Sequence, residues 1–129
     1  MTSIQPELWV ERPRDAVAFY QAAFGAVVLH LVGHGDEIVA QLAVGEAAFW
    51  VAGAATDMGR LSPLGAGGAT GRTLLVTDDP DEVVRRAVAA GATVTAAVAA
   101  EHGWRLGRIV DPFGHEWEVG VPLGPWPPP

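Results

Sequence analysis

Two strand-like runs of the chain alternate carboxylates with apolar side chains, and their residues are the ones whose chemistry could define a site. The runs are Glu7-Leu8-Trp9-Val10 and Glu116-Trp117-Glu118-Val119. Because successive side chains of a strand point to opposite faces, Glu116 and Glu118 share one face. A carboxylate in apolar surroundings can serve as a general base, and a flat indole can stack on planar or cationic groups.

The composition narrows the chemistry further. The 129 residues include no cysteine, so thiol nucleophiles, thiolate metal sites and disulfides are excluded. Fifteen acidic residues face eight basic ones, all arginine, and the formal net charge is −7. Without a basic stripe to track phosphates, nucleic acid is not expected as a partner. The chain also shows neither a signal peptide nor an apolar run that could span a bilayer, so we expect a cytoplasmic protein without membrane contact.

The elements that would position these residues come from an internal repeat. At an offset of 66 residues, Asp15 aligns with Asp81 and Gly25-Ala26 aligns with Gly91-Ala92. Each copy predicts a helix with an acidic start and apolar residues at helical spacing. Each helix is expected to end at its glycine, which tolerates the left-handed cap conformation.

Strand-like runs surround each predicted helix in the same order. One run precedes each helix, and three runs separated by turn residues follow it. The expected strands are Glu7–Val10, Ala26–Val32, Ile38–Val44 and Ala47–Val51 in the first half, and Thr73–Val76, Ala92–Ala99, Trp104–Val110 and Glu116–Val121 in the second.

The predicted fold class is therefore α+β, with two paired β-α-β-β-β modules in one domain of residues 1–129. The modules span about residues 4–52 and 72–121. A Gly/Ala-rich linker joins them over residues 53–71, and a proline-rich tail follows over 122–129. A helix covers only one face of a module's sheet, so the other face must meet a partner or enclose a cavity. We expect the strands to form a curved mixed sheet around a cleft.

Two motifs in this arrangement resemble those of the vicinal oxygen chelate superfamily, which includes glyoxalase I, bleomycin-resistance proteins and extradiol dioxygenases. The first, from Ala18 to Ala26, is similar to the helix-and-turn signature "FY…FGA". The second, from Val110 to Trp117, is similar to the turn "DPFGH.W" that enters the last strand. The likeness covers roughly residues 4–121 and is closest to the glyoxalase-like branch named after a phosphonate-utilisation operon.

Strand alternation assigns the aromatic residues to two environments. It places Trp50 and Trp117 on the helix side, as core, and Trp9, Phe49 and Trp104 in the cleft. The Asp-Pro-Phe-Gly-His segment has the composition of a tight turn, so a structural role is expected for its histidine.

The resemblance implies four metal-ligand positions, two on the first strands and two on the last strands. Carried over, they become Gln5, Phe49, Gly71 and Glu118, with Trp50 in place of Phe49 if the register shifts by one. Only Glu118 is a strong ligand, and catalytic divalent sites generally need about three. We therefore expect no metal and no cofactor. A divalent metal is the alternative, with Glu7, Thr73 and Glu116 as further donors if the register shifts by two.

The predicted function is metal-free binding of a small molecule, such as an antibiotic or a metabolite, by a protein similar to bleomycin-resistance proteins and expected to be a homodimer. The alternative is a lyase, isomerase or cyclase in which Glu118 is the base or a metal ligand. The predicted ligand-binding residues are Gln5, Glu7, Trp9, Phe49, Thr73, Trp104, Glu116 and Glu118.

Overall fold

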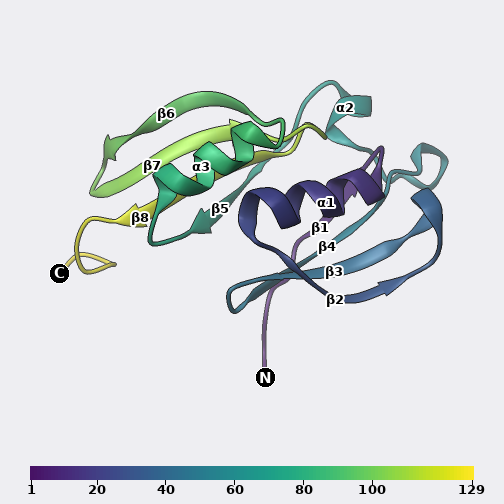
Figure 1. The fold of residues 1–129 in the computed structure, drawn as a ribbon, viewed down its shortest axis with the longest axis horizontal. Coiled ribbons are helices and arrows are strands. Elements are labelled where there is room, and N and C mark those ends of the chain that lie inside the picture. The colour runs from purple at the N-terminus through teal and green to yellow at the C-terminus, as the bar shows by residue number, and fades with distance from the viewer.

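The computed structural model describes residues 1–129 and contains the two expected modules (Figure 1). The first module consists of β1 (Glu7–Val10), α1 (Pro13–Phe24), β2 (Val27–Val32), β3 (Val39–Val44) and β4 (Ala47–Gly53). The second consists of β5 (Arg72–Val76), α3 (Pro80–Ala89), β6 (Thr93–Glu101), β7 (Trp104–Val110) and β8 (Glu116–Pro122). The 3₁₀ turn η1 (Gly35–Glu37) precedes β3, and the linker holds η2 (Thr56–Met58) and the short helix α2 (Pro63–Ala66).

The eight strands form two four-stranded mixed sheets with the same topology. Their orders are β1-β4-β3-β2 and β5-β8-β7-β6. In each sheet the first and last strands of the module pair in parallel, and the other neighbours are antiparallel. The α+β fold class and the two-module organisation predicted from the sequence are confirmed, with the strands divided between two sheets.

The two helices begin alike and end differently. Each has a proline in its first turn, Pro13 in α1 and Pro80 in α3, where the missing N–H costs no hydrogen bond. Gly25 caps α1 in the left-handed conformation, at φ 67°, as predicted. The helix α3 stops one residue earlier than predicted, with Ala90 as its cap, and Gly91 follows at φ 116°.

The helices join the modules to each other. They lie next to one another between the two sheets (Figure 1), and the residues of α1 and α3 are in contact. The Arg86 guanidinium of α3 donates a hydrogen bond of 3.2 Å to the Ala22 carbonyl of α1. One core of 21 buried apolar residues spans both modules. The linker therefore joins two halves that already share a core.

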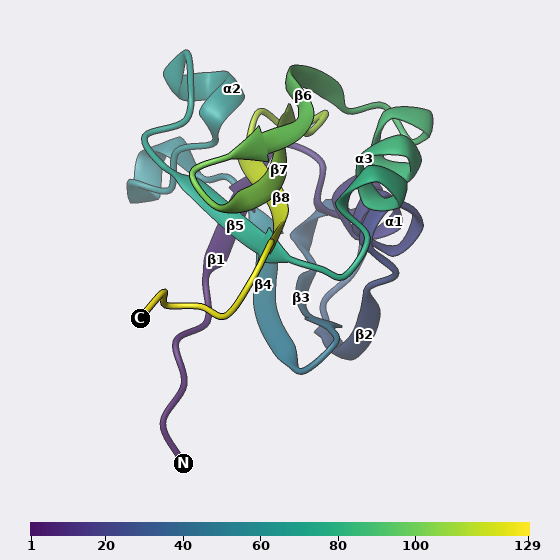
Figure 2. The same ribbon diagram turned by 90° about the vertical axis from the view of Figure 1, so that its left-hand side faces the viewer.

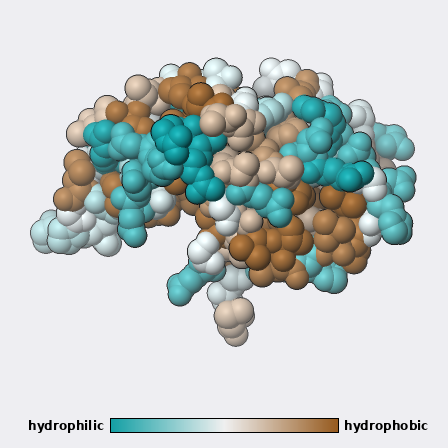
Figure 3. Space-filling view, viewed as in Figure 1, coloured by the Kyte–Doolittle hydropathy of each residue, from teal (hydrophilic) through white to brown (hydrophobic).

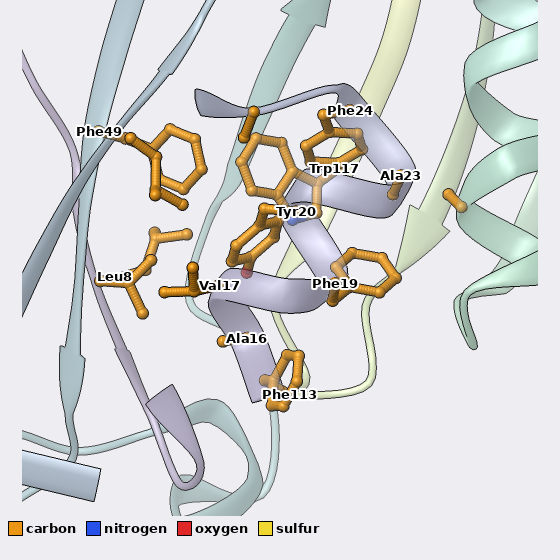
Figure 4. Close-up of a cluster of buried hydrophobic side chains, with 14 of the residues drawn as sticks. Leu8, Ala16, Val17, Phe19, Tyr20, Ala23, Phe24, Phe49, Phe113 and Trp117 are labelled. Atoms are coloured by element: carbon orange, nitrogen blue, oxygen red, sulfur yellow. The ribbon is translucent and has the colours of Figure 1, made fainter. Parts of the chain in front are cut away.

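Aromatic side chains from both modules meet in this core (Figure 4). The Tyr20 ring of α1 lies 5.2 Å from Phe49 of β4 and 5.6 Å from Trp117 of β8, measured between ring centroids. Trp117 is only 4% exposed, which confirms its predicted core position. Edge-to-face and tilted pairs of this kind stabilise a core beyond the area they bury.

A buried carboxylate ties the two sequence motifs together beneath this cluster. Asp111 is 4% exposed, and its Oδ2 accepts hydrogen bonds from the Tyr20 hydroxyl and from Trp117 Nε1 (2.9 Å). Its Oδ1 accepts from the backbone N–H groups of Phe113 and His115, at 2.9 and 3.0 Å. The four donors satisfy a charge that would otherwise be costly to bury. The family-like motifs thus build the core and the turn before β8.

The alternation predicted for β4 is wrong by one residue. Phe49, expected in the cleft, is 7% exposed and packs in the core, while Trp50, expected in the core, is half-buried on the opposite face of the sheet. The side chains of a strand alternate with a period of two, so a slip of one residue reverses every face. The run Ala47-Ala48-Phe49-Trp50-Val51 is apolar throughout and carries no polar residue that would reveal its register.

Candidate ligand-binding site

A cavity of about 470 Å³ is lined by the first strands of the two modules, by the linker and by the turn before β8. Figure 2 shows β1 and β5 together in this region, with α2 above them. The strands and the turn before β8 contribute Glu7, Leu8, Trp9, Arg72, Thr73, His115 and Glu116 to its lining. The linker contributes Gly59, Leu61, Ser62, Pro63, Ala66 and Gly68–Gly71. The volume suits a small organic molecule.

Four of the eight predicted ligand-binding residues come together in this cavity: Glu7, Trp9, Thr73 and Glu116. Glu7 is exposed and Glu116 is half-buried, and neither carboxylate has a hydrogen bond or ion pair within the protein. Trp9 is half-buried on the same face of β1 as Glu7. Two free carboxylates beside an indole give one wall an acidic and aromatic character.

Gln5 lies outside the cavity, on the open face of the first sheet. Its Oε1 accepts hydrogen bonds from Trp50 Nε1 at 2.8 Å and from Gln41 Nε2 at 3.0 Å. Both lone-pair directions of the amide oxygen therefore have donors.

Glu118 also lies outside the cavity lining, on the open face of the second sheet, between two guanidinium groups. Its Oε2 accepts from Arg108 Nε at 2.9 Å and lies 3.6 Å from an Nη of Arg72. Arg108 also contacts Glu101 at 3.3 Å, and the two glutamates, Glu118 first, raise the pKa of the Arg108 guanidinium. A carboxylate paired in this way lacks the apolar surroundings that the alternative of a Glu118 base requires.

Trp104 lies near the C-terminal tail, away from the cavity. Its ring centroid is 5.3 Å from that of Trp126, in an edge-to-face arrangement. The tail is held there by a hydrogen bond of 2.8 Å from the Leu123 N–H to the Gly103 carbonyl. In the structure, this predicted ligand-binding indole packs against the chain's own tail.

Among the residues that strand alternation did not assign to the cavity are two with basic side chains, Arg72 and His115. His115 Nε2 is 2.9 Å from the Trp9 carbonyl and bonds the turn before β8 to β1 in the other module. Because a carbonyl only accepts, this nitrogen carries the proton. Arg72 is the first residue of β5 and carries a cation into an otherwise acidic lining.

The linker wall is held in place by two contacts. Ser62 is 2% exposed; its hydroxyl donates to Glu11 Oε1 at 2.5 Å and accepts from the Gly65 N–H in the first turn of α2. On the other side, Gly114 (φ 88°) lies so close that a Cβ there would be 2.9 Å from Pro63 Cβ. The turn before β8 and the linker thus pack directly on each other.

The positions implied for a metal do not fit one in this structure. The first helical residues, Pro13 and Pro80, are 67 residues apart. Leu8 and Leu75, which face the helices from the first strand of each module, are separated by the same number. At this spacing Gln5 corresponds to Arg72, and the matching last-strand positions are Trp50 and Glu118. Tryptophan and arginine are not metal ligands, and both remaining oxygen donors are engaged by these same neighbours. No group of three or more histidine, aspartate or glutamate side chains lies close enough to hold an ion.

Comparison with known proteins agrees with this architecture. The family model of the glyoxalase/bleomycin resistance protein/dioxygenase superfamily matches residues 3–119, so the chain belongs to this superfamily. An uncharacterised protein of Mycobacterium bovis is 34% identical over 128 residues, covering 94% of this chain and 84% of the relative.

Two solved structures give the same result at the level of the fold. The X-ray structure of a gene product from Arabidopsis thaliana has a TM-score of 0.73 and 31% identity, covering 92% of this chain and 98% of the other. A mutant of the fosfomycin resistance protein FosX from Listeria monocytogenes, complexed with Mn(II) and 1S,2S-dihydroxypropylphosphonic acid, has a TM-score of 0.72. It is 15% identical, with 98% of this chain and 93% of the other covered, and shows a common fold. No helix of this chain is both long and apolar enough to cross a membrane.

Proposed function

We propose that this protein binds a small organic molecule with cationic and aromatic character, and that it does so in the cytoplasm as a homodimer without a protein-held metal. The cavity between β1, β5 and the linker carries the proposal. It combines two unpaired carboxylates, Glu7 and Glu116, with the Trp9 indole in a space of about 470 Å³. A cation gains from the carboxylates and from the electron-rich face of the indole.

Sequestration of an antibiotic or a metabolite is the role that best suits such a site. The family name includes bleomycin resistance, and one structural neighbour is named as a fosfomycin resistance protein. The alternative of a lyase or isomerase that uses Glu118 gains no support from the geometry, because that carboxylate is paired with Arg108 and lies outside the cavity lining.

Isothermal titration with cationic intercalating antibiotics, which combine a flat aromatic part with an amine, tests this proposal. We expect micromolar binding of at least one compound to the wild-type protein. The variant Glu7→Gln keeps the shape of the side chain and removes its charge, so it should weaken binding about tenfold. Glu46→Gln, at another exposed carboxylate, in the turn between β3 and β4, is the matched control and should bind like the wild type.

Two outcomes contradict the proposal. One is the absence of micromolar binding to any compound of the panel. The other is equal weakening by Glu7→Gln and Glu46→Gln, which would place the ligand outside the cavity. The proposal that ligand binding needs no metal is tested separately, by metal analysis of the purified protein and by titration in excess chelator. Stoichiometric nickel, zinc, iron or manganese, or loss of binding in the chelator, would contradict it.

The exposed surface of the first sheet supports the homodimer. Its edge strand β2 exposes four apolar side chains, Val27 (60%), Leu29 (55%), Leu31 (44%) and Val32 (50%). Hydrophobic surface gathers over β2 and β3 at the lower right of Figure 3. Exposed apolar side chains on an edge strand are typical of a protein contact, and we assign this contact to a second copy of this chain.

A further inference from the structure

Charged side chains of both signs line the cavity, and they indicate which charges a ligand should carry. Glu7 and Glu116 are unpaired carboxylates, and Arg72 is the single arginine of the lining. Arg72 and Glu116 are neighbours across the β5–β8 pair and share a face of the sheet, yet they form no ion pair. The cavity therefore offers an anionic and a cationic binding group at the same time.

Arg72 retains most of its binding capacity. A guanidinium has five N–H donors in a planar fork, and Arg72 makes a single contact, the ion pair of 3.6 Å to Glu118. Its side chain is 44% exposed, so a ligand can reach it. Planar forks of this kind bind carboxylates through two parallel hydrogen bonds.

Glu118 does not neutralise Arg72 completely, because it has a nearer partner. The same Oε2 accepts from Arg108 Nε at 2.9 Å, and Arg108 in turn contacts Glu101. The four side chains form a row of alternating charge, Arg72–Glu118–Arg108–Glu101, that begins in the cavity lining. Arg72 is the end of the row and the member with the weakest contact.

We propose that the ligand is a zwitterion that carries an amine and a carboxylate. The carboxylate binds Arg72, the amine binds the Glu7 and Glu116 side of the cavity, and the flat apolar part lies on Trp9. Glu118 acts as a positioning residue that holds Arg72 and limits how strongly it attracts an anion. This inference rests on the proposed function, because it names the ligand class of the same cavity.

Three indole compounds of similar size separate the two charges. L-tryptophan is a zwitterion, tryptamine keeps only the amine, and indole-3-propionate keeps only the carboxylate. In calorimetric titrations we expect tryptophan to bind about tenfold more tightly than either of the other two. Arg72→Gln should weaken tryptophan to the affinity of tryptamine and leave tryptamine unchanged.

The positioning role of Glu118 is tested by comparing the affinities of an anionic and a cationic ligand. Glu118→Gln removes the anion beside Arg72, so indole-3-propionate should bind about threefold more tightly while tryptamine does not gain. Glu101→Gln is the matched control, because it removes a carboxylate from the same row without a contact to Arg72. A merely structural Glu118 would change the affinities of all three compounds together, and that result would overturn its role.

Two results would overturn the zwitterion inference. If tryptamine binds as tightly as tryptophan and Arg72→Gln changes neither, the ligand is a simple cation, and the proposed function stands without the inference. If none of the three indoles binds at millimolar concentration, the inference fails, and the antibiotic titrations then decide separately whether the cavity binds cations at all.

Discussion

Tyr20 and Asp111 form a buried pair whose loss has a predictable cost. Tyr20→Phe keeps the ring in the aromatic cluster and removes one of the four donors to the Asp111 carboxylate. A buried acceptor that loses a partner is destabilised, so we expect the free energy of unfolding to fall by about 1–3 kcal/mol. Urea denaturation at neutral pH measures this. An unchanged midpoint would mean that the hydrogen bond contributes nothing to stability.

The same pair makes a second prediction, on alkaline stability. Burial, together with the nearby Asp111 charge, raises the pKa of the Tyr20 hydroxyl well above its ordinary value. As pH rises above about 10, the unfolded chain loses the phenol proton first, so the stability linked to Tyr20 is complete below that pH and decreases above it.

The composition isolates this effect. Tyr20 is the single tyrosine, and the chain has neither lysine nor cysteine, so no other side-chain type titrates between about pH 9 and 11.5. Wild-type urea midpoints should therefore fall across this interval, while those of Tyr20→Phe stay flat. Phenolate absorbance should appear together with unfolding. A phenolate signal from folded protein near pH 10 would contradict the assigned burial.

Residue-scale prediction from the sequence succeeded where local pattern is informative and failed where it is not. Alternation correctly placed Trp117 in the core, because polar and apolar residues alternate in β8. Of the two glutamates that it assigned to the cleft, Glu116 lines the cavity and Glu118 lies outside the lining. In β4 the residues are apolar throughout, so the sequence does not indicate which of them face the core. The predicted environments of Phe49 and Trp50 were therefore interchanged. The bond from Tyr20 to Asp111 joins residues 91 positions apart, and no local pattern encodes such a contact.

At the scale of elements, the turn before β8 and the linker helix α2 depend on each other through Gly114. An alanine there would have a strained φ of 88° and a Cβ 2.9 Å from Pro63 Cβ and 3.2 Å from Leu64 Cδ2. We expect Gly114→Ala to lower the free energy of unfolding by about 2–4 kcal/mol, from left-handed strain and overpacking together. Because Pro63 lines the cavity, the variant should also weaken binding of the cationic antibiotics.

A second glycine separates these two causes. Gly45, in the turn between β3 and β4, has φ 58°, and a Cβ at this position would have no neighbouring atom within 4 Å, so Gly45→Ala tests strain alone. We expect it to cost about 1–2 kcal/mol and to leave ligand affinity unchanged. Equal effects of the two substitutions on stability and binding would show that the linker does not rest on Gly114.

The strands and long helices were predictable because each has enough residues to show a period. Most of their predicted ends lie within two residues of the observed ones. The helix α2 was not predicted, since its four residues, Pro63–Ala66, are fewer than two turns and show no periodicity. A signal was present in Ser62-Pro63, a serine cap followed by proline, within the segment predicted as a linker.

At the scale of the whole molecule, the cavity could be predicted only in part. Three of its residues, Glu7, Trp9 and Glu116, followed from strand alternation, and Thr73 was expected only as a further donor near them, but the location of the cavity depends on how the modules are arranged. The α1–α3 contact and the bond from His115 to Trp9 hold the two modules so that β1 and β5 line the same cavity, and the linker completes the lining. Arg72 was not predicted as a site residue. The structure relates the modules by a spacing of 67 residues, one more than the offset of 66 found in the sequence, so the position matching Gln5 is Arg72 and not Gly71.

The surface of β2 gives the last prediction, which concerns the proposed homodimer. Sedimentation or light scattering should give a mass of twice the 13.5 kDa chain for the wild type. Leu29→Glu places a charge among the exposed apolar side chains of β2 and should shift the protein to monomer, because burying an unpaired carboxylate is costly. Leu123→Glu, at a leucine of similar exposure (59%) in the tail, is the control and should remain dimeric.

Ligand titrations of the monomeric variant then test whether the binding site depends on the dimer. None of the residues that line the cavity belongs to β2, so Leu29→Glu should bind the cationic antibiotics with wild-type affinity. A monomeric variant that no longer binds would show that the second copy contributes to the site. A wild-type protein that is already monomeric at micromolar concentration would mean that the exposed apolar side chains of β2 do not pair two copies of this chain.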